Sequence, residues 1–164
     1  MKVVLDTNCF IDAVNAESHA YGAMQKILKA THLGQLTLLV SRHSQHELEI
    51  KPDAALDLAK TLEVLPHFPV GTWGEQIGAW NQASGTWEDA TRNEATQQDL
   101  KKLAKAGTGI RDRGGYVDAL RAKVDAFVTS DLQLSGGEPA DRIAKKYGLK
   151  VLTPEQMAAE LSEK

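Results

Sequence analysis

Four short runs of apolar and β-branched residues recur along the chain, separated by longer segments whose apolar positions have helical spacing. The runs are VVLD from residue 3, LTLLVS from residue 36, DAFVTSD from residue 125 and LKVLT from residue 149. They are almost wholly apolar, as is typical of strands buried on both faces. This pattern predicts a three-layer α/β/α fold, with a central parallel sheet covered by helices on both sides.

Seven helices are predicted around these strands, with ends defined to within a few residues. They cover residues 19–31, 42–50, 53–62, 88–106, 113–124, 139–147 and 154–162. Pro139 and Pro154 fall near two of the helix starts, where a missing backbone N–H costs nothing. A chain of 164 residues that is 42% hydrophobic is large enough for one core, so we predict a single domain over residues 1–164.

The stretch 71–110 differs from the rest because it is polar and poor in aliphatic residues. It holds all three tryptophans, Trp73, Trp80 and Trp87, at heptad spacing, but several glycines argue against one unbroken helix. We therefore predict a helical insertion at about 71–110. Its tryptophans fit packing onto the core, a dimer contact or base stacking on single-stranded nucleic acid, and the sequence leaves these alternatives open.

The apolar runs and the single cysteine indicate where in the cell the protein is expected. No run of about twenty apolar residues could span a bilayer, and the N-terminus lacks the features of a secretory signal. The expectation is a cytoplasmic protein without a membrane partner. The single cysteine, Cys9, cannot form an internal disulfide and lies in an apolar stretch, which favours a buried, inert residue.

The formal net charge of −3 does not by itself favour nucleic-acid binding. Basic residues are nevertheless concentrated in one region of the sequence. A solvated helix face explains such a run most often, and a phosphate-facing stripe is the functional alternative. The residues concerned are Lys101, Lys102, Lys105, Arg111, Arg113, Arg121 and Lys123.

Four acidic residues are predicted to meet at one edge of the sheet. Asp6 and Asp131 follow buried strands, while Glu47 and Asp112 fall near the starts of helices at the same edge. Ligands of open α/β sheets bind outside the carboxyl ends of the strands, so acids placed there converge in space. Clustered carboxylates must take up protons or a cation, which makes this set a candidate metal site.

The ligand chemistry favours Mg²⁺ or Mn²⁺ over zinc, because oxygen ligands occur here without paired His or Cys. The chain has no CxxC or HExxH pattern, and its five histidines lack ligand spacing. One or two such ions could activate water and stabilise the leaving oxygen in phosphodiester hydrolysis.

Each acid also has a purely structural explanation. Asp6 and Asp131 could form Asx turns after their strands. Glu47 could belong to a capping box with Ser44, and Asp112 could be a helix N-cap. Any one of these explanations is plausible alone, but the shared edge favours a common function.

Taken together, VVLDTN, the acid in SQHELE and an Asp-led helix before DAFVTSD resemble the PIN-domain nucleases. The resemblance spans most of the chain outside the insertion. It implies a twisted parallel sheet and a metal-dependent ribonuclease acting on RNA. Many members are toxins restrained by an antitoxin, and many form dimers, so an antitoxin and a homodimer are possible partners.

The resemblance also implies roles for single residues. Asp6 and Asn8 match the D-[ST]-[NS] motif, and Asp131 matches the acid of T-x-D. Glu47 and Asp112 match the second and third acids. Thr129 and Ser130 would support Asp131 by hydrogen bonding.

Two alternatives concern which acid faces the site. Arg113, Gly114 and Gly115 follow Asp112, so the first turn of that helix is expected to be irregular, and Asp118 is an alternative ligand. Asp118 lies roughly 240° around the helix from Asp112, so both cannot face the site. Glu47 and Glu49 are roughly 200° apart, and the family pattern favours Glu47.

The leading hypothesis is therefore a Mg²⁺- or Mn²⁺-dependent endoribonuclease that uses Asp6, Glu47, Asp112 and Asp131. Arg111 and Arg113 are candidates for holding the RNA backbone. A phosphatase with Asp6 as covalent nucleophile is less well supported, because haloacid-dehalogenase-type enzymes place an Asp where this chain has Asn8. A non-catalytic module that binds RNA or protein is the third alternative.

Overall fold

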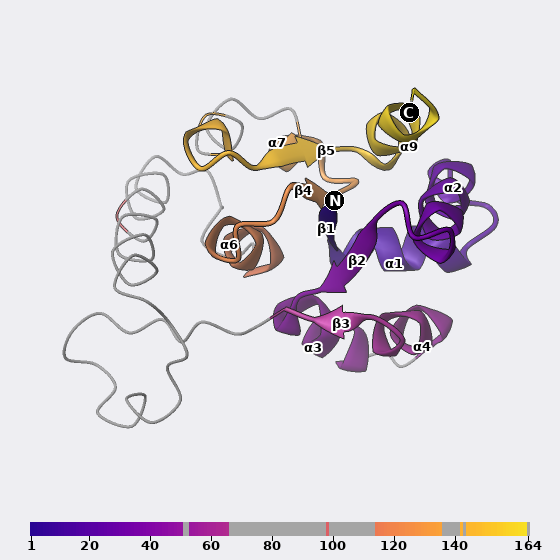
Figure 1. Cartoon of the computed structure of the whole chain (residues 1–164). Helices are drawn as coiled ribbons and strands as arrows, with labels where there is room; N and C mark the ends of the chain where they lie inside the picture. Colours follow the sequence, from indigo (N-terminus) through magenta and orange to yellow (C-terminus); the bar gives the residue numbers. More distant parts are fainter. Residues whose placement is uncertain (51–52, 66–97, 99–113, 136–141, 143, 164) are drawn as a thin grey trace.

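A parallel β-sheet forms the centre of the molecule. The computed structural model describes residues 1–50, 53–65, 98, 114–135, 142 and 144–163. Its strands are β1 (Lys2–Leu5), β2 (Thr37–Val40), β3 (Glu63–Val64), β4 (Ala126–Val128) and β5 (Lys150–Leu152). All neighbouring strands pair in parallel, in the order β3-β2-β1-β4-β5 (Figure 1). The prediction of a parallel sheet is confirmed.

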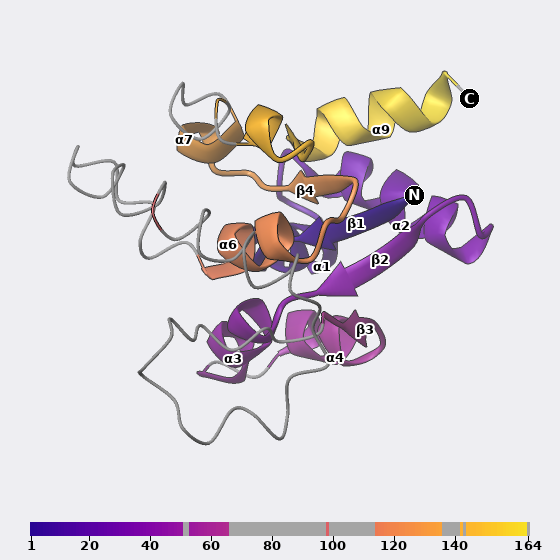
Figure 2. The ribbon, with the colours of Figure 1, turned by 60° about the vertical axis from the view of Figure 1, so that its left-hand side comes forward.

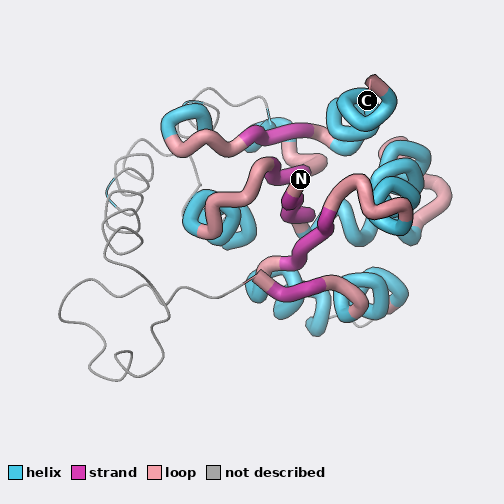
Figure 3. Tube along the Cα trace, in the orientation of Figure 1, coloured by secondary structure: helices cyan, strands magenta, loops and turns pink. Residues whose placement is uncertain are grey.

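Helices cover both faces of this sheet (Figure 3). They are α1 (Thr7–Val14), α2 (Tyr21–His32), α3 (Arg42–Ile50), α4 (Ala54–Lys60), α6 (Gly114–Arg121), α7 (Leu132–Ser135) and α9 (Pro154–Ser162). Arg142 and residues 144–146 are helical as well. The observed architecture is α/β, with helical layers on either side of the sheet, as the sequence predicts.

The strands divide their side chains between two hydrophobic clusters. Val3 and Leu5 of β1 belong to the cluster packed under α1, α2, α4 and α9. Val4 points the other way, into the cluster that includes Tyr116 of α6 and Phe127 of β4, whose rings meet edge to face at 5.9 Å. Because both faces of each central strand are buried, the strands are apolar along their length.

Helix α9 has the predicted bounds, and so does α3. Thr153 caps α9 through a capping box with Gln156, and Pro154 occupies the first turn. The helices predicted at 19–31, 53–62 and 113–124 correspond to α2, α4 and α6, which begin within two residues and end within three residues of the predicted positions.

Three short elements were not predicted. Helix α1 buries Cys9, Phe10 and Ala13 on one face, but the exposed Ile11 and Val14 obscure this pattern in the sequence. Strand β3 has two residues, both exposed at the sheet edge. Helix α7 has four residues and follows β4 directly. Strand β3 and helix α7 are too short to form a periodic pattern.

The predicted insertion at 71–110 lies outside the described residues except for Gln98, which is helical. The three tryptophans lie there as well, so the single-domain organisation and the alternatives for these tryptophans stay predictions. In the described part of the chain, no helix is both long and apolar enough to cross a membrane.

Cys9 is fully buried in α1, as predicted. Its Sγ donates to the carbonyl of Val128 at 3.3 Å, and burial raises the pKa of the thiol. The reactive thiolate form is therefore disfavoured at neutral pH.

The strand register aligns the three residues that follow β1, β2 and β4. Leu5 lies opposite both Val40 and Val128, so Asp6, Ser41 and Thr129 come next at one level of the sheet. Figure 2 shows the strands from the side, with their carboxyl ends directed toward α3 and α6. These ends form the floor of the candidate site.

Candidate functional site

The site lies where the chain reverses its direction across the sheet. From β1 the chain proceeds outward to β2 and β3, and then returns to add β4 and β5 on the other side of β1. The loops leaving β1 and β4 therefore diverge, which opens a crevice between their carboxyl ends. Asp6 follows β1 at this point, and the segment from Thr129 to Asp131 follows β4.

Asp6 is at once a helix cap and a cavity acid. It is the N-cap of α1, where its Oδ1 accepts from the backbone N–H of Thr7 at 2.9 Å. Its Oδ2 accepts from the hydroxyl of Thr129 at 2.7 Å. Asp6 is therefore hydrogen-bonded to the backbone after its strand, as the structural explanation expects. This explanation accounts for one carboxylate oxygen, and the second oxygen has a different partner.

The electrostatic surroundings of Asp6 oppose its ionisation. Burial raises the pKa of its carboxyl above the usual value, and the carboxylates of Glu47 and Asp131 raise the pKa further. Hydrogen bonds from Thr129 and from the backbone of Thr7 lower it in part. Glu47 and Asp131, from distant parts of the sequence, are thus both near enough to act on Asp6.

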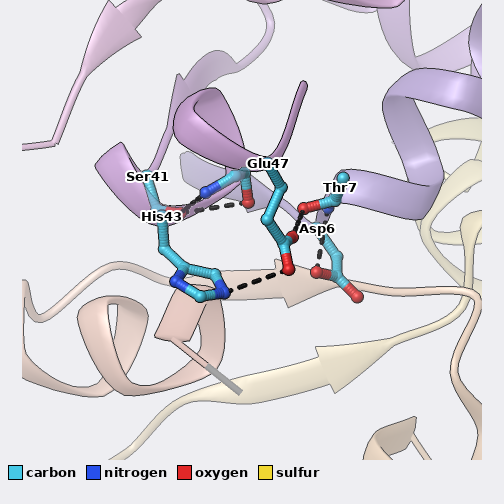
Figure 4. Close-up of polar contacts among 6 residues, drawn as sticks. Asp6, Thr7, Ser41, His43 and Glu47 are labelled. Atoms are coloured by element: carbon cyan, nitrogen blue, oxygen red, sulfur yellow. Dashed lines mark hydrogen bonds and ion pairs between the residues drawn. The ribbon is translucent and has the colours of Figure 1, made fainter. Parts of the chain in front are cut away.

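Glu47 projects from α3 toward α1 (Figure 4). Its Oε2 accepts from the hydroxyl of Thr7, and its Oε1 lies 3.2 Å from Nε2 of His43, one turn earlier in α3. The capping-box explanation for Glu47 is wrong, because the backbone N–H of Ser44 donates to Ser41 at the start of the helix. Glu47 therefore connects two elements at the cavity.

Glu49 lies elsewhere on the same helix. It is about half exposed and pairs with His46 at 3.8 Å. Glu47 lines the cavity, whereas Glu49 is not among the lining residues. The two side chains face different sides because their positions are roughly 200° apart around the helix axis.

The loop after β4 links Asp131 to Asp6. The buried hydroxyl of Thr129 accepts from the backbone N–H of Asp131 at 3.0 Å while it donates to Asp6. Ser130 differs from the expectation that it supports Asp131. Its hydroxyl donates to Oδ2 of Asp12 at 2.6 Å, and a hydroxyl has only one hydrogen to donate.

A cavity of about 490 Å³ opens beside these residues. Its described lining combines acidic, polar and apolar residues, and it contains no Lys or Arg. The residues are Asp6, Thr7, Asn8, Ile11, His43, Glu47, Leu48, Ile50, Asp53, Gly114, Gly115, Tyr116, Phe127 and Leu134. Carboxylates gathered without Lys or Arg form a setting in which a cation can be bound.

Some predicted site residues lie outside the described part of the chain. These are Asp112, Arg111 and Arg113. Asp118, the alternative to Asp112, belongs to α6 and does not line the cavity. Burial lowers the pKa of Arg121, and Asp118 raises it. The first turn of α6 begins at Gly114 and is helical, so the irregularity expected at Gly114 and Gly115 is absent.

The candidate acids were predicted from the sequence, as was the hydrogen bond between Thr129 and Asp131, but the partners of Glu47 were not. Thr7, His43 and Asp53 line the cavity, and the first two hold Glu47. A signal existed for His43, which precedes Glu47 by the four residues that place two side chains on one helix face. Among the residues that the structure describes, no three acidic, His or Cys side chains form a group that could hold a metal ion.

The fold and the cavity define the molecule as an α/β protein with a parallel sheet and an acid-lined crevice at the switch point of that sheet. No family model matches the sequence, and a comparison with curated proteins gives no significant match. The fold is similar to a chain in the crystal structure of VapBC2 from Rickettsia felis, bound to a DNA fragment from their promoter. The TM-score is 0.51 and the identity 14%, over 93% of this chain and 98% of that chain. This likeness supports the fold and leaves the chemistry to the residues.

Proposed function

We propose that this protein is an endoribonuclease that requires Mg²⁺ or Mn²⁺ and hydrolyses RNA phosphodiester bonds. One observation carries the proposal. Asp6 and Glu47 line one cavity from separate elements, and the charges of Glu47 and of Asp131, which lies in the loop after β4, both act on Asp6 at the switch point of the sheet. The likeness to VapBC2 supports the fold on which this proposal is built, and the motifs that resemble the PIN-domain nucleases supply the reaction.

The donor set suits a hard divalent cation. Asp6 and Glu47 offer carboxylate oxygens at the cavity, and such oxygens are the preferred ligands of Mg²⁺ and Mn²⁺. We propose that Asp131 and Asp112 complete the set. A bound cation of this kind would polarise a phosphate group and lower the pKa of a water molecule.

The protein's own groups would orient the acids and admit the substrate. The hydroxyl of Thr129 fixes one oxygen of Asp6, and the hydroxyl of Thr7 fixes one oxygen of Glu47. Exposed Asn8 lines the cavity and can donate its amide hydrogens to a phosphate oxygen. We propose that Arg111 and Arg113 hold the RNA backbone.

Cleavage of a labelled RNA by purified protein with Mn²⁺ tests the proposal. Asp6→Asn and Glu47→Gln should each lower the rate roughly a hundredfold or more, since even outer partners of metal ligands cost 10- to 100-fold. Glu49→Gln is the matched control and should cleave at the normal rate, because Glu49 does not line the cavity. Equal cleavage by wild type and Asp6→Asn would refute the mechanism.

A second pair of variants assigns the third acid. Asp112→Asn should lose activity as Asp6→Asn does, while Asp118→Asn should keep it, because Asp118 acts on Arg121 and does not line the cavity. The reverse result would make Asp118 the ligand.

A non-catalytic binding module is the second candidate. It is favoured by the absence of a three-membered ligand group among the described residues. Calorimetric titration separates the two: no binding at millimolar Mg²⁺ or Mn²⁺ would favour the module, and binding that Asp6→Ala abolishes would favour the nuclease.

We also propose that the protein acts in the cytoplasm as a toxin with an antitoxin partner, on the basis of the family resemblance. Induced expression should then arrest growth, and Asp6→Ala should relieve the arrest. Normal growth with wild type at high expression would count against this role.

A further inference from the structure

We propose that His43 is a positioning residue of this site, which directs the carboxylate of Glu47 into the cavity by donating from Nε2. The inference rests on the proposed function, because it assigns a role within the same site. It goes beyond the four acids by naming the group that orients one of them.

The contacts of Glu47 come from two sides. Nε2 of His43 lies 3.2 Å from Oε1, and the hydroxyl of Thr7 donates to Oε2. A carboxylate has about four lone-pair positions, so contacts to both of its oxygens can hold its plane and still leave positions available. Figure 4 shows Glu47 held between His43 on one side and Thr7 on the other, with Asp6 beside Thr7.

The imidazole ring is confined by helix α6. A Cβ added at Gly114 would lie 2.3 Å from Cγ of His43 and 2.4 Å from its Nδ1, so only a glycine lets the ring occupy this place. Glu47 and Gly114 thus bound the ring on two sides. A ring held in this way keeps Nε2 beside Oε1 of Glu47.

Stability alone does not explain this pair. The side chains of His43 and Glu47 are 41% and 45% exposed, and ion pairs this exposed contribute little to folding. Both residues nevertheless line the cavity. We therefore assign the contact a role in orienting the carboxylate of Glu47, as outer partners orient metal-binding side chains.

The same helix supplies an internal comparison. His46 also lies beside a glutamate, Glu49, but the contact is longer, at 3.8 Å, and the His46 side chain is 79% exposed. Neither residue lines the cavity. Two His–Glu pairs on one helix thus differ in whether they face the site.

The test compares Mn²⁺ affinity across two pairs of variants. His43→Phe keeps a ring against Gly114 but removes the donor, whereas His43→Gln keeps an N–H of similar reach. His46→Phe and His46→Gln are the matched controls. Calorimetry should show Mn²⁺ affinity about tenfold weaker in His43→Phe, near normal in His43→Gln and unchanged in both His46 variants, with similar melting temperatures throughout.

Two outcomes of the titration would overturn the inference. One is normal affinity in His43→Phe. The other is an equal loss in His43→Phe and His43→Gln, which would assign the effect to the shape of the ring. If wild type binds no Mn²⁺, the proposed function fails, and the inference is then decided on metal-free protein.

Metal-free crystal structures provide that separate decision. In wild type, Glu47 should adopt one conformer with Oε1 within hydrogen-bond distance of His43. In His43→Phe, its carboxylate should rotate away or occupy several conformers. The same single conformer in both proteins would contradict the positioning role, whatever the titration gives.

Discussion

At the scale of single residues, Asp6 combines two roles that make opposite demands. As the N-cap of α1 it accepts a backbone hydrogen bond, which stabilises the start of the helix. As a partly buried acid near Glu47 and Asp131, it has a raised pKa, and its charge is unfavourable in the folded state without a cation. A site of this kind lowers stability in exchange for function.

Asp6→Asn should therefore raise the free energy of unfolding of the metal-free protein at pH 7. Because the pKa of Asp6 is raised on folding, its stabilising contribution is full below the unfolded pKa, about 3.9, and is lost as pH rises through the folded pKa. The advantage of the variant should thus shrink toward zero below about pH 4. Urea unfolding with EDTA at pH 7 and pH 3.5 measures both values. An advantage of the same size at both would show that ionisation is not the cause.

Asp53 also lines the cavity, but its hydrogen bonds are those of a helix N-cap. Its Oδ1 accepts from the backbone N–H groups of Ala55 and Leu56 at the start of α4. Asp53→Ala should lower the free energy of unfolding by about 1 kcal/mol, and Asp53→Ser should restore most of it. Mn²⁺ affinity should stay normal in Asp53→Ser. A loss of affinity there would add Asp53 to the ligands.

At the scale of elements, helices α3 and α6 contact each other, and both supply residues to the lining of the cavity. Gly114 and Gly115 begin α6 where it meets His43, Ser41 and Ser44. Ser41 and Ser44 are fully buried and bonded to each other at the start of α3, so they have little room to move. Close approach, and not a break in the helix, accounts for the two glycines.

Gly115→Ala should destabilise the protein by about 1 kcal/mol, the lower end of the range for overpacking. Its Cβ would lie 3.3 Å from Oγ of Ser44 and 3.4 Å from Oγ of Ser41. Gly22→Ala in α2 is the matched control, because nothing lies within 4 Å of its added Cβ. The free energy of unfolding of that control should rise by about 0.5 kcal/mol, because alanine has a higher helix propensity than glycine. Denaturant unfolding would contradict the packing argument if both variants gained stability equally.

Helices α2 and α9 were predictable from sequence because each buries apolar residues at helical spacing. Helices α3 and α9 have the predicted bounds, and α9 also has a start signal in Thr153 and Pro154. Helix α1 was missed because its buried face has only Cys9, Phe10 and Ala13, interrupted by exposed aliphatic residues. A segment of eight residues obtains its structure mainly from the core against which it packs.

At the scale of the whole molecule, the strand order explains which parts of the site could be predicted. Any parallel sheet places Asp6 and Asp131 at one edge, so their meeting follows from sequence position alone. The contacts of Glu47 with Thr7 and His43 depend on how α3 lies beside α1 and α6. That arrangement is fixed by tertiary packing, and a linear pattern does not specify it.

The same arrangement predicts how a cation affects the whole fold. Mn²⁺ bound at the switch point of the sheet would link β1, β4 and α3 and neutralise acids that repel one another. A ligand that binds only the folded state stabilises it by about 1.4 kcal/mol at ten times its Kd. In a domain of this size, we expect a rise of roughly 3 to 6 °C in melting temperature.

Thermal unfolding with and without Mn²⁺ measures this effect, and EDTA should reverse it. Asp6→Asn should melt at a temperature that Mn²⁺ barely changes, because the variant loses one ligand and much of the repulsion. Gly22→Ala should show the full rise, since Gly22 lies in α2 and does not line the cavity. An equal rise in Asp6→Asn and wild type would place the cation elsewhere on the molecule. A rise confined to proteins with intact Asp6 and Glu47 would tie the cation to the switch point, where Glu47 and Asp131 act on Asp6.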